Sequence, residues 1–179
     1  MLIRPSIVDF STIPLPPGVG RGITEAVSWE EFGEFTRDVN GDGFTLRIPG
    51  KDKCILDYSC AGDWAAPAFK HLPLHSEIDV TVIKPWHHPV PAGQTSVTLL
   101  RTPHSADDML VFLDDKTFVT GWTLVHSGGS PTRVVTVPAQ TRLAYVEYRP
   151  RIHGFLTAKN DDGQEWNADV NWNLQIREK

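Results

Sequence analysis

Apolar and polar residues alternate over most of the chain, in short runs that end at Gly, Pro, Asn or Asp. In one such run, Ile78, Val80 and Val82 alternate with polar residues. Because successive side chains of a strand point to opposite faces, this period of two predicts β-strands with one buried face. The other predicted strands are 44–48, 54–58, 97–101, 109–113, 117–125, 133–137, 143–148, 152–159 and 174–177.

The pattern before the first predicted strand is different. Residues 1–27 are rich in Pro and Gly, and we expect an extended arm that packs on one domain spanning residues 28–179. Ser28 to Glu31 resembles a capping box, which predicts a short helix. Gly33 and the turn at 40–43 would end that helix.

The predicted elements indicate an all-β protein. About ten strands with almost no helix favour an antiparallel two-sheet β-sandwich or jelly roll. The length of 179 residues fits a single domain, and 40% hydrophobic residues can supply its core. Late in the chain, we expect residues 143–166 to form a hairpin that turns at Asp161–Gly163 and packs Trp166.

Composition narrows the partners and the location. The net charge is −5 and Lys and Arg are scattered, so we expect no nucleic acid partner. Asp9 and the prolines around it interrupt any signal-peptide core, and no stretch has the apolar length of a membrane span. We therefore expect a cytoplasmic protein without membrane contact. Cys54 and Cys60 do not have a zinc-site spacing and are predicted to be free thiols.

An ordered series of segments resembles a known superfamily. The segments are Trp29 with GFTLRIPG (43–50), DWAAPAF (63–69), EIDVTV (77–82), 92–101, DDMLVF (107–112), and 143–166 ending in DDGQEW. Their order is similar to that of concanavalin A-like lectins and glucanases, and especially to the small β-sandwich at the C-terminus of β-xylosidases and its stand-alone bacterial relatives. The resemblance implies a concanavalin A-like jelly roll. The chain departs from the family pattern at the corner 149–152 and at His87–His88.

Glu77 and Asp79 are the candidate catalytic residues. Glucanases of the superfamily that the chain resembles carry E-x-D-x-E or E-x-D-x-x-E on one strand, whose alternation places the carboxylates on one face. Their retaining chemistry needs a second carboxylate about 5 Å from the nucleophile. Here Thr81 or Val82 stands at the acid/base position, and neither side chain can protonate a leaving group. We therefore favour a solvated strand face over an active site.

The segment that contains Asp38, Asn40 and Asp42 matches the first half of a calcium-binding loop, D-x-N-x-D-G. Position twelve of such a loop would be Pro49 instead of a bidentate Glu, and a predicted strand follows in place of a helix. We interpret the segment as an Asx- and Gly-rich turn and expect no cofactor, with calcium as the alternative.

Two of the six tryptophans, Trp64 and Trp86, lie in predicted Pro- and Gly-bounded loops. Flat aromatic faces bind the apolar side of sugar rings, and a few polar groups bind the hydroxyls. His87, His88 and Arg101 are the predicted hydrogen-bond donors. Core packing is the alternative interpretation of both tryptophans.

Together these features favour a non-catalytic carbohydrate-binding or accessory protein of sugar metabolism, which binds an oligosaccharide on a concave sheet face. Two alternatives stay open. One is a glycosidase-like enzyme in which Asp108 or Glu147 supplies the missing carboxylate. The other is a structural β-sandwich that uses its sheet surface for assembly, for example into a homo-oligomer.

Overall fold

The structure is a computed structural model that describes residues 8–11, 13–16, 22–30, 33–47, 52–63, 65–125, 133–164 and 169–179. Every regular element in these ranges is a β-strand, and the strands pair antiparallel, which confirms the predicted all-β class. The chain divides into two compact units. Unit 1 contains Asp79–Ile152 and the N-terminal residues to Asp9, and unit 2 contains Phe10–Ile78 and His153–Lys179.

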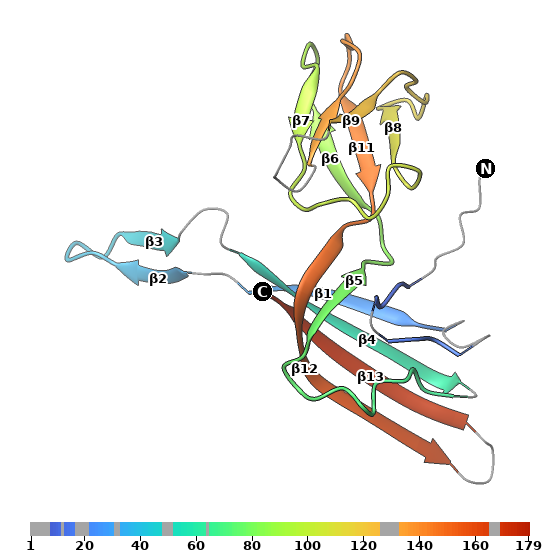
Figure 1. The fold of residues 1–179 in the computed structure, drawn as a ribbon. Helices are drawn as coiled ribbons and strands as arrows, with labels where there is room; N and C mark the ends of the chain where they lie inside the picture. Colours follow the sequence, from blue (N-terminus) through green and yellow to red (C-terminus); the bar gives the residue numbers. More distant parts are fainter. Residues whose placement is uncertain are drawn as a thin grey trace. The chain divides into compact units, whose positions relative to one another are not determined.

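Unit 2 is built on a five-stranded sheet (Figure 1). Its strand order is β1 (Thr24–Glu30), β4 (Lys53–Asp63), β13 (Asp169–Glu178), β12 (Arg151–Gln164) and β5 (Glu77–Thr81). Burial alternates along β4 and β13, as the sequence pattern predicts for a sheet with one solvated face. The buried face carries Leu56, Tyr58, Leu174 and Ile176.

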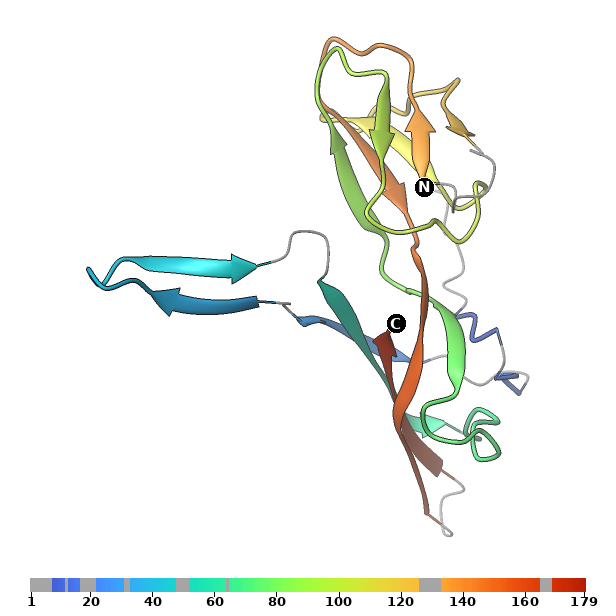
Figure 2. The same ribbon diagram turned by 60° about the vertical axis from the view of Figure 1, so that its left-hand side comes forward.

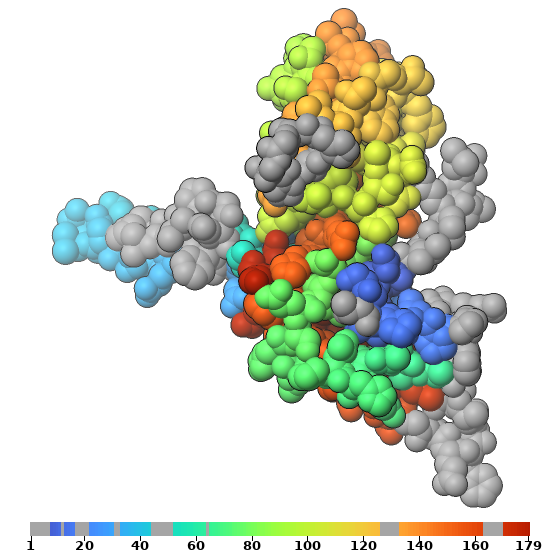
Figure 3. All heavy atoms as spheres, viewed as in Figure 1, coloured from blue at the N-terminus to red at the C-terminus, as the bar shows by residue number. Residues whose placement is uncertain are grey.

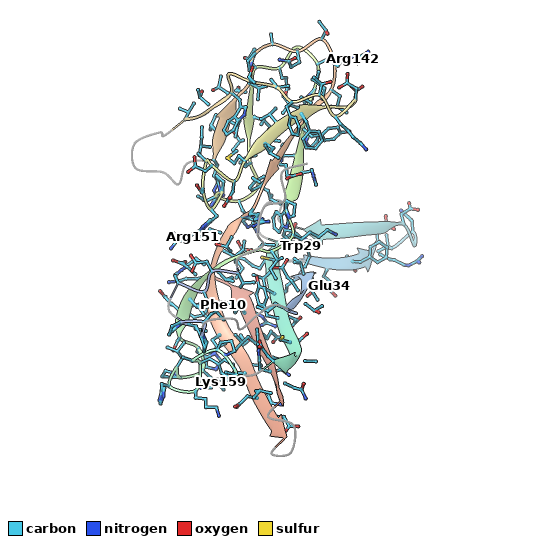
Figure 4. All side chains as sticks on the ribbon, turned by 90° about the vertical axis from the view of Figure 1, so that its right-hand side faces the viewer. Phe10, Trp29, Glu34, Arg142, Arg151 and Lys159 are labelled. Carbon is cyan, nitrogen blue, oxygen red and sulfur yellow. The ribbon has the colours of Figure 1, made fainter. Side chains whose placement is uncertain are left out.

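Irregular segments cover this buried face. The Phe10 ring meets Tyr58 edge-on with ring centroids 5.2 Å apart. In Figure 3 the blue N-terminal segment lies beside the green loop that follows β4, and the Ala68 amide donates to the Pro14 carbonyl at 3.3 Å. Lys159 of β12, labelled in Figure 4, donates to three carbonyls of this loop, at 2.6–3.1 Å. An ammonium group thereby satisfies carbonyls that no strand pairs.

Unit 1 contains two three-stranded sheets. One has the order β6 (Trp86–Val90), β11 (Ala144–Tyr148), β8 (Leu110–Leu113) and the other β7 (Ser96–Thr98), β10 (Val134–Thr136), β9 (Thr123–Val125). Figures 1 and 2 both show β6 and β11 side by side. Both sheets and their connections contribute to one core, which contains Val90, Leu99, Met109, Val111, Val135, Val137, Ala144, Val146 and Tyr148. Residues of both antiparallel sheets therefore share one hydrophobic core.

The remaining strands, β2 (Gly33–Arg37) and β3 (Gly43–Arg47), form a two-stranded hairpin. Among the described strands they pair only with each other. Neither strand β2 nor strand β6 was expected from the sequence, because Gly and Pro in these segments are typical of loops.

The predicted helix at Ser28 is wrong. Ser28 and Trp29 lie in β1, opposite Ile55 and Cys54 of β4, and β1 also crosses the predicted arm boundary at residue 27. A capping box stabilises only the first turn of a helix, whereas seven residues of β1 gain partners from a long neighbouring strand. Long-range pairing therefore outweighs the local signal.

The predicted hairpin 143–166 is also wrong. Strands β11 and β12 belong to different sheets, and β12 pairs instead with β13 and lies next to β5. Residues 161–163 are part of β12 and do not form a turn. The predicted strand 117–125 is shortened to Thr123–Val125, with one isolated bridge from Phe118 to Phe112. Trp166 lies outside the described residues.

Two further sequence expectations can be compared with the described ranges. No helix in them has the length and apolarity of a membrane span. Cys54 and Cys60 are buried, and neither forms a disulfide there. The Cys54 thiol lies 3.3 Å from a Glu178 carboxylate oxygen, and the Cys60 thiol lies 3.6 Å from Asp63. Burial and the neighbouring Asp63 carboxylate raise the pKa of Cys60, so its thiol stays protonated.

Candidate functional site

The outer face of the β6–β11–β8 sheet in unit 1 carries an aromatic surface. We call the residues His87, Pro89, Phe112, Tyr145 and Glu147 the aromatic platform. Alternation along β11 buries Ala144, Val146 and Tyr148 and leaves Tyr145 and Glu147 on the opposite, half-exposed face. The register then places Tyr145 between Pro89 and Phe112, and Glu147 beside His87. Residues far apart in the sequence thus meet on one sheet face.

Two rings form the centre of the platform. Phe112 and Tyr145 are stacked, with centroids 5.8 Å apart and an interplanar angle of 29°. His87 meets Phe112 edge-on at 6.0 Å. The Phe118 side chain, which is 64% exposed, belongs to the residue that bridges to Phe112. Phe112 and Tyr145 are each partly exposed, so they place aromatic surface on this sheet face, and aromatic surface favours contact with ring-shaped apolar faces.

A polar pair borders these rings. The His87 Nε2 atom lies 3.1 Å from a Glu147 carboxylate oxygen, and the side chains are 47% and 25% exposed. Because an ionised carboxylate only accepts hydrogen bonds, the imidazole N–H is the donor. A carboxylate held by an imidazole is well placed to bind hydroxyl groups of a neutral ligand.

Trp86 and His88 lie on the inner side of the same strand. Trp86 meets Tyr148 edge-on, with centroids 6.5 Å apart, and packs against the core of unit 1. Burial lowers the pKa of His88, because the charged imidazolium is poorly solvated there. In this arrangement alternation places His87 on the platform and directs Trp86 and His88 away from it.

Arg101 and Trp64 complete the predicted sugar-binding set. An Arg101 guanidinium nitrogen donates to the Leu100 carbonyl at 3.1 Å, and the Arg101 amide donates to the Tyr148 hydroxyl at 3.4 Å. Burial is the main cause of the raised pKa of Tyr148. Arg101 therefore lies against the inner side of the sheet through Tyr148, and Trp64 lies outside the described residues.

The two candidate catalytic carboxylates are each held by cations. In unit 2, Glu77 accepts from Lys179 at 2.5 Å and lies 3.4 Å from the His153 imidazole. The hydrogen bond and charge of Lys179 lower the pKa of Glu77. In unit 1, Asp79 pairs with Arg151 at 2.8 Å. The lowered pKa keeps Glu77 ionised, so Glu77 does not replace the proton donor that is missing at the position of Thr81 or Val82.

Thr81 cannot supply the missing acid, and the two alternative carboxylates, Asp108 and Glu147, lie on other elements. Thr81, at the position of the acid/base carboxylate, is 3% exposed and its hydroxyl lies 2.9 Å from Nδ1 of His104. Asp108 is half-buried in the turn before β8. Glu147 is the one of the two alternative carboxylates that lies on the aromatic platform.

The candidate calcium residues form the turn of the β2–β3 hairpin. One Asp38 carboxylate oxygen accepts the backbone N–H groups of Asn40 and Asp42, each at 2.9 Å. Gly41 has a φ of 87°, a left-handed conformation that glycine adopts without strain. Within the described ranges, no three His, Cys, Asp or Glu side chains gather as metal ligands. The hydrogen bonds match the Asx turn favoured from the sequence.

Sequence reasoning missed Tyr145 and Phe112. The available signal was the alternation of 143–148, in which Tyr145 and Glu147 occupy the positions opposite to the small apolar residues. An aromatic residue on the predicted solvent face of a strand is the feature that indicates a surface site.

A scan of protein-family models and a search of curated proteins found no match to this chain.

Proposed function

We propose that the protein is a non-catalytic carbohydrate-binding protein that holds an oligosaccharide on the aromatic platform. The observation that supports this most strongly is the stacked, half-exposed pair Phe112 and Tyr145 beside the polar pair His87 and Glu147. A sugar ring has an apolar face and polar edges, and this site offers a matching apolar surface with a hydrogen-bonding border.

The binding mechanism follows from that geometry. The apolar face of one sugar ring stacks on Tyr145 and Phe112, which removes apolar surface from water. Glu147 accepts hydrogen bonds from ring hydroxyls, and His87 keeps the carboxylate in position. The sheet surface is open, so little ligand area is buried and the affinity is expected to be weak.

Other parts of the proposal rest on the sequence. The ion pairs of Glu77 and of Asp79 support a structural role for these carboxylates, in line with binding without hydrolysis. A concanavalin A-like jelly roll is the fold that the sequence resemblance implies, and the shared core of the two small sheets supports a sandwich arrangement within unit 1. A cytoplasmic location stays a prediction.

Isothermal titration with xylan-, cellulose- and glucan-derived oligosaccharides tests the proposal. We expect Tyr145→Ala to weaken binding by about two- to tenfold, because a stacked aromatic ring contributes roughly 0.5 to 1.5 kcal/mol. Binding should survive moderate salt, since the ligand is neutral. Phe35→Ala is the matched control, because Phe35 is also an exposed aromatic residue, at 65%, but lies in the β2–β3 hairpin.

Two results would contradict the proposal: binding that Tyr145→Ala leaves unchanged, or no binding to any oligosaccharide. In the second case, assembly becomes the better proposal. The hairpin supports it, because an isolated two-stranded hairpin is marginally stable in water and this one exposes Phe35 and Val39. Self-association in sedimentation experiments that Phe35→Ser abolishes would then be expected.

A further inference from the structure

An open groove of about 480 Å³ lies on the five-stranded sheet of unit 2. It is lined by residues from four strands or their ends, and most of the lining side chains are polar and exposed. These polar residues are Thr24, Ser59, Asn160, Asp162, Asn171 and Asn173. The volume is within the usual range for small-molecule sites. All of its described lining residues belong to unit 2, whereas the aromatic platform belongs to unit 1.

The strand register explains why polar groups gather here. Ser59 of β4 lies opposite both Thr24 of β1 and Asn173 of β13, and Asn173 lies opposite Asn160 of β12. These four residues form one row that crosses four adjacent strands. Directly opposed side chains are about 5 Å apart, so the row presents closely spaced hydroxyl and amide groups on a single face.

Two of the three asparagine side chains in the groove are available to a ligand. Asn171 is fixed, because its amide oxygen accepts the Gly62 backbone N–H at 3.0 Å. The structure records no side-chain hydrogen bond to another described residue for Asn160 or Asn173. Each of these two amides therefore offers two donors and one acceptor. A fixed amide next to two available ones favours a ligand that has both donors and acceptors.

We propose that this groove is a second binding site, for a small neutral polyhydroxylated ligand of one or two sugar rings. The charge of the lining selects the ligand class. It contains no Lys or Arg among the described residues, and the Asp162 carboxylate disfavours anions. A single carboxylate is too few for a tightly held metal cation. Hydroxyl groups act as donor and acceptor at once, as amide and hydroxyl side chains do.

The groove and the aromatic platform would bind ligands through different interactions, so an experiment can rule out one proposed site without ruling out the other. The groove offers hydrogen bonds without an exposed aromatic face, because Trp172, the aromatic residue in its lining, is 2% exposed. Hydrogen bonds to an open surface replace equally good bonds to water, so affinity is weaker than on the platform. The groove site does not depend on the proposed function of the platform.

Nuclear magnetic resonance titration of the 15N-labelled full chain tests this site. The probes are cellobiose and xylobiose as ring sugars, sorbitol as an open-chain polyol, and triglycine as an amide ligand without hydroxyls. We expect both sugars to shift the side-chain NH2 signals of Asn160 and Asn173. The double variant Asn160→Ala and Asn173→Ala should raise the dissociation constant about tenfold, read from the backbone amide signals of Ser59 and Asn171, which line the same groove. Sorbitol shifting the same signals as strongly as the two sugars would overturn the proposal of a ring-shaped ligand.

The controls separate this site from the platform. Asn40→Ala makes the same substitution in the β2–β3 turn and should leave the titration unchanged. Tyr145→Ala should abolish only the shifts at the platform. Absence of shifts at Asn160 and Asn173 with every hydroxylated probe would overturn the proposal, as would a response to triglycine alone or an equal loss in Asn40→Ala.

Discussion

His88 shows how the position of one side chain on a strand sets its chemistry. Its neighbour His87 is exposed and paired with Glu147, whereas His88 points to the inner side of β6. Burial lowers the pKa of His88 below the ordinary value of about 6.5. The unfolded chain therefore takes up a proton at a higher pH than the folded protein does. Above about pH 6.5 His88 is neutral in both states and does not lower the stability of the fold. As the pH falls below this value, proton uptake by the unfolded chain lowers the free energy of unfolding.

Replacing this titrating group should flatten the pH dependence of stability. We expect the melting temperature of His88→Gln to fall less than that of the wild type between about pH 7 and pH 5, because glutamine takes up no proton. Thermal unfolding across this range measures the difference. His71→Gln, in an exposed loop, should keep the wild-type slope. Equal slopes for His88→Gln and the wild type would place the pH dependence in other groups.

At the scale of single residues, sequence reasoning predicted some residues of the aromatic platform but not their arrangement. His87 was predicted as a ligand-binding residue and Glu147 as an alternative carboxylate, each for a separate reason. Only the β6–β11 register makes them a pair, because it sets Glu147 directly opposite His87. Sequence spacing cannot supply that register, since 60 residues separate the two.

At the scale of elements, the pairing of β12 with β13 depends on one close approach. A Cβ atom on Gly154 of β12 would lie 2.4 Å from the Arg177 carbonyl oxygen of β13. Backbone atoms in a paired strand cannot move as a flexible side chain can. Glycine therefore allows the two strands to approach at this position.

Gly154→Ala should consequently destabilise unit 2. We expect a loss of about 2 kcal/mol in the free energy of unfolding, within the range for added atoms in a well-packed site. Urea unfolding measures it. Gly22→Ala is the control, because its Cβ would meet only the Cys60 sulfur, at an ordinary 3.8 Å. A midpoint for Gly154→Ala that matches the control would contradict the close approach.

For the whole molecule, the chain path makes the segment Asp79–Ile152 of unit 1 an insertion in unit 2. The chain passes from unit 2 into unit 1 within β5 and returns within β12, and these strands are neighbours in one sheet. The Val82 amide donates to the Pro150 carbonyl at 3.0 Å, so the two ends of the insertion lie side by side. The buried residues Leu56, Tyr58, Leu174 and Ile176 of the five-stranded sheet all lie within residues 10–78 and 153–179.

Removal of the insertion should therefore leave unit 2 folded. We expect a variant in which two glycines replace residues 83–149 to keep a dispersed amide spectrum, with signals of β4 and β13 at their wild-type positions. A short loop between adjacent chain ends carries little entropic cost. The Gly154→Ala change in this shortened chain should be as destabilising as in the full chain. A collapsed spectrum would show that unit 2 needs unit 1 to fold.

The sequence by itself determined the secondary-structure class and most strand positions. Alternation decides which residues of a strand face the core, and this property is local. It located β3, β5, β8, β10 and β11 to within a few residues, and it located the first half of β4. It failed where Gly, Pro or a capping pattern carried a competing local signal, at β2, β6 and β1, because neighbouring strands supply hydrogen bonds that no local pattern reveals.

The tertiary structure decided which strands become neighbours, and with that both candidate sites. The platform needs residues 87, 112, 145 and 147 on one face, and the groove needs a row across β1, β4, β13 and β12. Strand partners and register depend on the packing of the whole sheet, and a shift of one residue would turn each of these side chains to the opposite face. The sequence therefore supplied the polar and aromatic side chains, and the folded sheets brought them together.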